Sequence, residues 1–217
     1  MDVVVQAVPQ LASGLTITAF ISIGAAIVAI GAAFSAGLAR LSRLRAVRWL
    51  ATAYIEFFRG TSALVQLYWA FYALPMIGIV LPATVVGIGG LGLCIGAYGA
   101  EVVRAAIGAI GQGQFDAAAA LGLSPLKRMT LVILPQALRM ILPQFGNLAI
   151  ELMKGTALVS LITLHDLTFE AQMVNVTTLR TAEIFAAILV IYYILARCIT
   201  FGFRALENYI NRGTSVI

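Results

Sequence analysis

Charged residues are scarce in this sequence. Asp, Glu, Lys and Arg supply 11% of the 217 residues, whereas hydrophobic residues supply 61%. A soluble domain of this length needs more polar surface, because part of every globule faces water. The composition therefore predicts an all-α polytopic membrane protein with a single domain over residues 1–217. The net charge of +5 does not indicate nucleic acid, because the arginines cluster beside apolar segments, as the positive-inside rule describes.

Further absences exclude other classes of function. The two cysteines, Cys94 and Cys198, lie in apolar surroundings, so no disulfide is predicted. The one histidine, His165, has no second ligand beside it, so no metal site is predicted. The chain has no G-x-x-x-x-G-K-S/T phosphate loop and no convergent catalytic set, which argues against an enzyme. Its start, MDVVVQAVPQ, has no basic n-region, so we expect no cleaved signal peptide.

Five stretches are apolar and long enough to cross a bilayer, which takes about 20 residues. They cover residues 11–38, about 62–79, a segment starting near 83, about 136–163 and about 183–203. The arginine-rich run ARLSRLRAVR follows the first, which predicts an outer N-terminus and an inner C-terminus. VRWLATAYIEFFRG predicts an amphipathic helix along the inner surface, and residues 165–183 an outer polar loop. The glycines of the third span predict close helix packing.

The segment FDAAAALGLSPLKR, residues 115–128, interrupts this apolar pattern. Its alanines predict a short helix over residues 114–121, and Gly122 stands where a left-handed C-terminal cap belongs. Ser124 and Pro125 then predict the N-cap and first position of a second helix. We expect Pro135 and Pro143 to interrupt the helix that follows. A capped helix–turn–helix that exposes Phe115, Asp116 and the Gly122 turn would suit docking to a protein partner.

Ionisable residues inside membrane spans are costly and indicate functional sites. Glu151 and Lys154 lie three residues apart on one predicted helix, so they share a face. They either form a structural ion pair or face a translocation cavity. Glu101 and Arg104 repeat the spacing near the inner boundary, where snorkelling or pairing between subunits is the favoured interpretation. The candidate translocation path comprises Gln144, Asn147, Glu151 and Lys154.

The run GQFDAAAALGLSPLKRMTLVILPQALRMILPQFGN resembles the cytoplasmic EAA loop of MetI-like ABC importer permeases, specifically the polar amino-acid family. Asp116 occupies the position of the family's glutamate, and Ala117, Ala118 and Gly122 match its pattern, as does LPQA at residues 134–137. YIEFFRGTSALVQL, GAYGAEVVRAAI and ELMKGTALVSLITLHDLTF resemble three further family segments in the expected order. The variants KGTALVSLITL and YGAEVVR look most like ectoine/hydroxyectoine permeases.

The resemblance implies a type I ABC importer permease fold in a bacterial inner membrane, with a coupling loop at residues 112–128. It also implies partners: a dimer of ATP-binding subunits that hold ATP and Mg, a second permease subunit, identical or homologous, and an extracytoplasmic solute-binding protein. No cofactor is expected on this chain. The substrate would be an amino acid or a zwitterionic compatible solute. An ion-coupled secondary carrier is the alternative, although such carriers carry paired repeats with broken helices. The residues implied to contact the ATPase are Phe115, Asp116, Ala117, Ala118 and Gly122.

Overall fold

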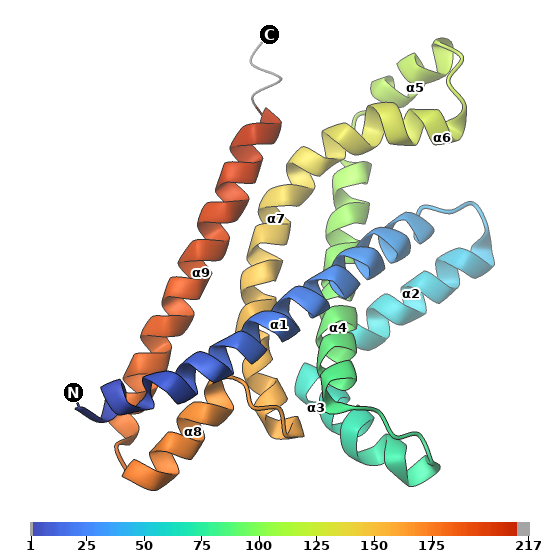
Figure 1. The fold of residues 1–217 in the computed structure, drawn as a ribbon. Coiled ribbons are helices and arrows are strands. Elements are labelled where there is room, and N and C mark those ends of the chain that lie inside the picture. The colour runs from blue at the N-terminus through green and yellow to red at the C-terminus, as the bar shows by residue number, and fades with distance from the viewer. Residues whose placement is uncertain (1, 212–217) are drawn as a thin grey trace.

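The computed structural model describes residues 2–211, which are helical apart from short connections and contain no strand (Figure 1). The predicted inner tail extends to residue 213, so its end lies outside the described residues. Four helices form the long elements: α1 (Asp2–Ala39), α4 (Ala83–Gly108), α7 (Leu134–Gly155) and α9 (Thr181–Asn211). In Figure 1, α1 crosses the bundle diagonally and packs on α4 and α7.

Small residues allow α1 and α4 to approach closely. A Cβ atom built on Gly92 would lie 2.7 Å from Cβ of Val28, and one on Gly96 would lie 2.6 Å from Cβ of Ala32. In lipid, such close van der Waals contacts drive helix association, because the acyl chains are as apolar as the helix surfaces and burying one against the other gives no hydrophobic free energy. The predicted packing role is confirmed at these two glycines, whereas Gly89 has no atom within 4 Å of a built Cβ.

The predicted second span differs from the structure. Residues 63–77 form three short elements: α3 (Ala63–Tyr68), the π-helical η1 (Trp69–Ala73) and the 3-10 helix η2 (Leu74–Ile77). Together they are shorter than a membrane span, and only four helices within the described residues are long and apolar enough to cross. The amphipathic helix α2 (Arg45–Gly60) does not lie apart from the bundle, because it buries Ala51 and Ile55 and packs on α1 and α4. From the end of α1, the chain therefore runs back to the start of α4 at the other end of the bundle through α2 and residues 63–77 together.

The expectation that Pro135 and Pro143 interrupt the fourth span was wrong. One helical stretch runs through α6 (Pro125–Lys127), the π-helical η3 (Arg128–Ile133), α7 and the 3-10 helix η4 (Thr156–Ile162). In η3 the N–H of Leu134 donates to the carbonyl of Met129, five residues back. This wider turn directly precedes Pro135 and accommodates its ring, which would clash with a regular α-helical turn. Pro143 lies inside α7 without ending it.

The predicted outer loop contains a helix, α8 (Leu167–Thr178), that packs on α1 and α9. Its buried residues Leu167, Ala171 and Val174 follow the helical spacing i, i+4, i+7. They join Leu11 and Ile184 in one apolar cluster. The polar residues between them outnumber the apolar ones, so composition alone favoured a loop. The spacing was the signal that would have identified the helix.

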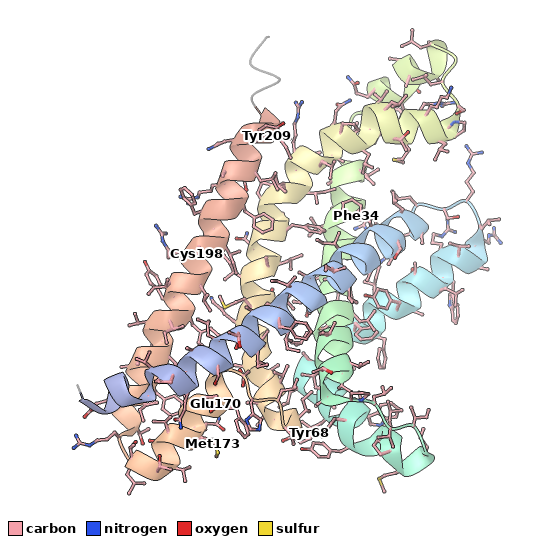
Figure 2. The ribbon with its side chains drawn as sticks, in the orientation of Figure 1. Phe34, Tyr68, Glu170, Met173, Cys198 and Tyr209 are labelled. Carbon is pink, nitrogen blue, oxygen red and sulfur yellow. The ribbon has the colours of Figure 1, made fainter. Side chains whose placement is uncertain are left out.

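The two ends of the bundle differ in charge. The connection from α1 to α2, the short helix α5 (Gln112–Ala120) and the C-terminal end of α9 lie at one end in Figure 1. α8 and the connection from η2 to α4 lie at the other end. The first end carries the arginine run that the positive-inside rule assigns to the cytoplasm. Along α9 the side chains of Cys198 and Tyr209 are exposed (Figure 2).

Candidate functional site

The predicted coupling loop, residues 112–128 and called the coupling loop below, begins with α5 and turns at Gly122. Gly122 has a φ of +73°. Its N–H donates to the carbonyl of Ala119 at 2.9 Å, and the N–H of Leu123 donates to that of Ala118 at 3.2 Å. This pair of bonds is the Schellman motif, which requires the left-handed conformation that glycine adopts without strain. The N-cap predicted for the next helix is also formed, since the hydroxyl of Ser124 accepts from the N–H of Lys127 at 3.5 Å.

The structure separates the predicted loop residues into two faces. Phe115 is half-buried and Ala118 is buried, and Phe115 packs on the cluster formed by the inner ends of α4 and α7. Phe115 and Ala118 therefore share the face of α5 that packs on the bundle, because residues three apart on a helix share one face; their contact with the ATPase stays a prediction. Asp116 and Ala117 are exposed. So are Leu121 and Leu126, at 79% and 73%, which the sequence did not single out.

Side-chain hydrogen bonds hold the coupling loop against the long helix. Nε2 of Gln136 donates to Oε1 of Gln114 at 3.2 Å, which ties α5 to the start of α7. Nε of Arg128 donates to the carbonyl of Leu123 at 2.8 Å, which holds the Gly122 turn against η3. The loop is thus attached to α7 through Gln114, and its turn is held against its own last residue, Arg128, where η3 begins. A displacement of α5 would be passed to α7 through these contacts.

A polar stripe, defined as Gln144, Asn147, Glu151 and Lys154, runs along α7. All four side chains are exposed in the single chain. Their spacing of three, four and three residues places them on one face over about 15 Å of helix, at 1.5 Å per residue. Glu151 and Lys154 form no ion pair with each other or with any other described residue. The structural pair considered for these two residues is therefore not formed within the chain.

Glu101 joins two arginines at the inner ends of α1 and α4. One carboxylate oxygen lies 2.6 Å from Nη1 of Arg40, and the other lies 2.9 Å from both Nε and Nη2 of Arg104. Both pairs are partly buried. Glu101 and Arg104 therefore pair within the chain, and together with Arg40 they fasten α1 to α4. Snorkelling and pairing between subunits stay predictions. Arg40 lies 61 residues from Glu101, so its part in this pairing is not evident from the sequence.

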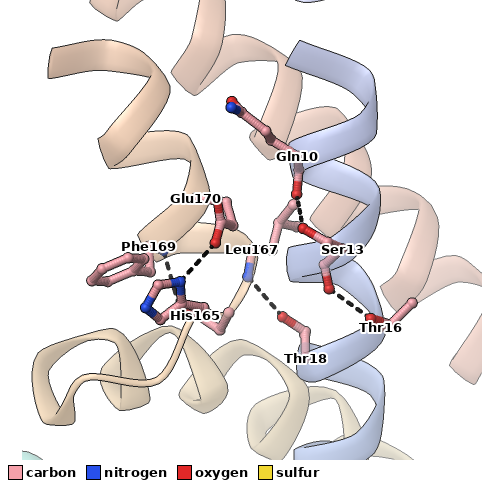
Figure 3. Close-up of polar contacts among 9 residues, drawn as sticks. Gln10, Ser13, Thr16, Thr18, His165, Leu167, Phe169 and Glu170 are labelled. Atoms are coloured by element: carbon pink, nitrogen blue, oxygen red, sulfur yellow. Dashed lines mark hydrogen bonds and ion pairs between the residues drawn. The ribbon is translucent and has the colours of Figure 1, made fainter. Parts of the chain in front are cut away.

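The outer connection between η4 and α8 is fastened to α1 (Figure 3). The N–H of Leu167 donates to Oγ1 of Thr18 at 3.0 Å, and both residues are buried. A Cβ atom on Gly14 would lie 2.8 Å from the carbonyl oxygen of Asp166, so α1 and the connection are in close contact. His165 is exposed, and its Nδ1 lies 3.1 Å from a carboxylate oxygen of Glu170.

The carboxylate of Asp166 begins α8 as its N-cap. Its two oxygens accept from the N–H groups of Thr168 at 3.2 Å and Phe169 at 3.0 Å. Such caps satisfy donors that the first helical turn leaves unpaired. Burial raises the pKa of Asp166 to about 6, against the opposing effect of these hydrogen bonds. The outer connection therefore holds a carboxyl group that titrates near neutral pH.

The FRGTSALVQ block marks the break between α2 and α3. Thr61 is extended, with a φ of −122°. Gln66 reaches back over the break, where its Nε2 donates to Oγ1 of Thr61 at 2.7 Å and to the carbonyl of Phe58 at 3.1 Å. The glutamine therefore satisfies a carbonyl that the end of α2 leaves unpaired. This contact explains why a polar side chain is placed at this position of an apolar segment.

These features together define a multi-pass membrane protein with a capped loop at its arginine-rich end. The model of the family described as "binding-protein-dependent transport system inner membrane component" matches residues 29–212. The chain belongs to this family, and it is a multi-pass permease of the type I ABC importer fold in a bacterial inner membrane.

Relatives and solved structures match over most of the chain. A probable amino-acid ABC transporter permease of Sinorhizobium fredii is 42% identical over 185 residues, which are 82% of this chain and 78% of that protein. An L-cystine transport system permease of Bacillus subtilis is 32% identical, over 94% of this chain and 88% of that protein. The crystal structure of an amino acid ABC transporter with histidines superposes with a TM-score of 0.88 at 33% identity, covering 95% of this chain and 96% of that one. The MetNI methionine transporter, at 18% identity, shares the fold with a TM-score of 0.73 over 97% of both chains.

Proposed function

We propose that this chain carries a polar amino acid across the membrane as a subunit of an ATP-driven, binding-protein-dependent importer. The observation that supports this most directly is the continuous helical stretch from Pro125 to Ile162. It includes the last four residues of the coupling loop, 125–128, and the whole polar stripe. A force applied to the loop would therefore act on the same helix that lines the path of the substrate.

The polar stripe is suited to a zwitterion. The ammonium of Lys154 would bind the substrate's carboxylate, and the carboxylate of Glu151 would bind its ammonium. Leaving one such charge in lipid costs about 2.5 to 3.5 kcal/mol. The exposed stripe therefore needs a polar surface opposite it, and a second permease subunit around a water-filled path would supply one. Gln144 and Asn147 would offer neutral hydrogen-bonding groups further along the same face.

The substrate class is inferred from the relatives. Those described above are an amino-acid permease and an L-cystine permease by name, and a probable glutamine permease of Bacillus subtilis is also similar, at 28% identity. We therefore favour polar amino acids. The ectoine-like variants KGTALVSLITL and YGAEVVR have no support in these names. Ectoine is itself a zwitterion that the same stripe could bind, so it belongs in the same substrate panel.

The coupling loop would receive the ATPase. Asp116 and Ala117, together with the exposed pair Leu121 and Leu126, present one charge and two apolar side chains around the Gly122 turn. Exposed apolar side chains rimmed by polar groups are typical of a docking surface. ATP and Mg would be held by that separate subunit and not by this chain. Closure of the ATPase dimer would move the loop, and with it α7, between two packed arrangements.

Uptake by the assembled importer in proteoliposomes tests the role of the stripe. We expect Lys154→Met to lower uptake of a labelled amino acid by about tenfold or more, since a charge-assisted hydrogen bond is worth about 1.5 to 3 kcal/mol. Lys154→Arg keeps the charge and should restore part of the activity. Arg139→Met removes an exposed charge from the same helix outside the stripe and is the matched control.

Each outcome of this experiment has a defined meaning. Full uptake by an assembled Lys154→Met importer would remove the stripe from the substrate path. Equal losses in Lys154→Met and Arg139→Met would point to a general effect on α7. Uptake that needs an ion gradient and no internal ATP would favour the secondary carrier over the ABC importer. Comparing glutamine, cystine and ectoine in the same vesicles would decide between the two substrate classes.

A further inference from the structure

A hollow lined by arginines lies where α1 ends and α2 begins. Its volume is about 990 Å³. We call it the arginine hollow, and its charged and aromatic lining comprises Arg40, Arg45, Arg48, Arg104 and Trp49. Arg45, Arg48, Trp49 and Thr52 fall at helical spacing on one side of α2. Ala51 and Ile55, on the adjacent side of α2 next to Arg48, are turned to the bundle.

The hollow has an excess of positive charge. Arg40 and Arg104 share the single carboxylate of Glu101, so this group of three carries a net charge of +1. Among the described residues, no carboxylate forms an ion pair with Arg45 or Arg48. Arginines that converge without carboxylate partners favour an anion, because the planar guanidinium binds phosphate oxygens with paired hydrogen bonds.

The position of the hollow favours a lipid over a soluble anion. It lies directly after the apolar span of α1, at the end of the bundle that the arginine run assigns to the cytoplasm. Trp49 and Leu50 of α2 are 69% and 62% exposed beside the arginines. Exposed Trp next to basic residues is typical of the boundary between head groups and acyl chains. The coupling loop is a separate projection at this end, carried by α5 and α6.

We propose that the arginine hollow binds the phosphodiester head group of an anionic phospholipid from the inner leaflet. The four guanidinium groups hold the phosphate oxygens. Trp49 and Leu50 contact the upper part of the acyl chains. A lipid bound in this way connects the end of α1, the start of α2 and the inner end of α4.

The two tryptophans of the chain allow a direct test. Trp69→Phe leaves Trp49 as the only reporter, and Trp49→Phe leaves Trp69, which lies in η1 away from the hollow. The full-length chain is placed in nanodiscs of one fixed mixture of phosphatidylglycerol and phosphatidylcholine. In one sample only the phosphatidylglycerol is brominated, and in the other only the phosphatidylcholine. Quenching per mole of brominated lipid then reports which lipid lies beside the tryptophan.

We expect Trp49 to be quenched preferentially by phosphatidylglycerol, and Trp69 by both lipids alike. Arg45→Gln and Arg48→Gln should each lower the preference at Trp49 by about fivefold, as the contribution of one arginine near an anionic surface predicts. Arg43→Gln removes an exposed charge that does not line the hollow and should leave the preference unchanged. Unaltered quenching of Trp69 in these variants shows that the chain remains folded and inserted.

Four results would overturn the proposal. Equal quenching of Trp49 by both lipids would show that no anionic lipid is selected. If Arg43→Gln lowered the phosphatidylglycerol preference at Trp49 as much as Arg45→Gln does, the preference would come from the general positive charge of this surface and not from the hollow. Protection of Trp49 from both lipids would indicate a protein surface. Loss of the preference when inorganic phosphate is added at constant ionic strength would identify a site for soluble anions.

Discussion

Replacing Gly122 should uncouple the importer without unfolding its membrane spans. A Cβ atom at this position would meet nothing within 4 Å, so no steric clash contributes to the effect. The whole cost comes from the φ of +73°, which an L-residue adopts at a cost of about 1 to 2 kcal/mol. That energy changes the ratio of formed to unformed turn by a factor of about 5 to 30.

Losing the turn would release several contacts at once. The two Schellman hydrogen bonds at the end of α5 would break. The carbonyl of Leu123 would also leave Nε of Arg128, which now fixes the turn to η3. A β-branched residue should have the largest effect, because it is a true outlier at positive φ, whereas Asn is the usual substitute at this cap position. We therefore expect the order Gly122→Asn, Gly122→Ala, Gly122→Val, from mildest to most severe.

The assay is co-purification of the ATPase subunit together with ligand-stimulated ATP hydrolysis in proteoliposomes. Gly122→Val should reach the membrane at normal levels and yet lose the ATPase or its stimulation. Asp116→Ala should show a smaller defect, since it removes one exposed charge and leaves the helix whole. Coupling at the wild-type level in Gly122→Val would refute the assignment of residues 112–128 as the coupling loop. A defect of equal size in all three Gly122 variants would refute the argument from φ.

Two further predictions concern the membrane topology and the protonation of Asp166 in the outer connection. The background for the first is a chain with Cys94 and Cys198 replaced by Ser. In it, Arg43→Cys should react with an impermeant thiol reagent only from the cytoplasm, and Gln172→Cys only from outside. The reverse labelling pattern would show that the predicted topology is inverted. Because the Asp166 pKa of about 6 lies above its ordinary value of 3.8, the folded chain binds this proton more tightly than the unfolded chain. Stability should therefore rise as pH falls from 7 toward 4, by at most about 3 kcal/mol. Asp166→Asn keeps an oxygen for the cap and should remove this dependence of Tm on pH; an unchanged dependence would assign it to other groups.

The coupling loop could be predicted from sequence because its determinants are local. A glycine at the C′ position and a Ser-Pro pair at the next N-cap specify the turn without help from distant residues. Which side of its helix α5 turns toward the bundle could not be predicted in the same way. Phe115 and Ala118 turn inward because the inner ends of α4 and α7 present an apolar cluster there, and that cluster exists only in the folded chain.

The membrane spans also combine features that the sequence predicts with features that only the folded chain determines. The apolar runs of α1, α4 and α9 exceed the length that a bilayer requires, so hydropathy alone located them. Residues 63–77 form only short apolar helices, because the break at Thr61 separates them from α2. The polar stripe was predicted as a set of residues. Spacing also places its residues on one face, but their exposure and the missing Glu151–Lys154 pair depend on side-chain positions that spacing does not determine.

The π-helical segment η3 preserves the angular register between the coupling loop and the polar stripe although Pro135 lies between them. A π-helical turn holds one residue more than an α-helical turn, so the wide turn takes up an extra residue and the helix on either side stays nearly in phase. Deleting one residue from η3 would therefore leave the coupling loop facing almost as it does now relative to Glu151 and Lys154. The regular α-helical turn that results would instead bring the ring of Pro135 against the carbonyl four residues before it. The extra residue thus relieves a steric conflict at the connection between loop and span without changing their relative orientation.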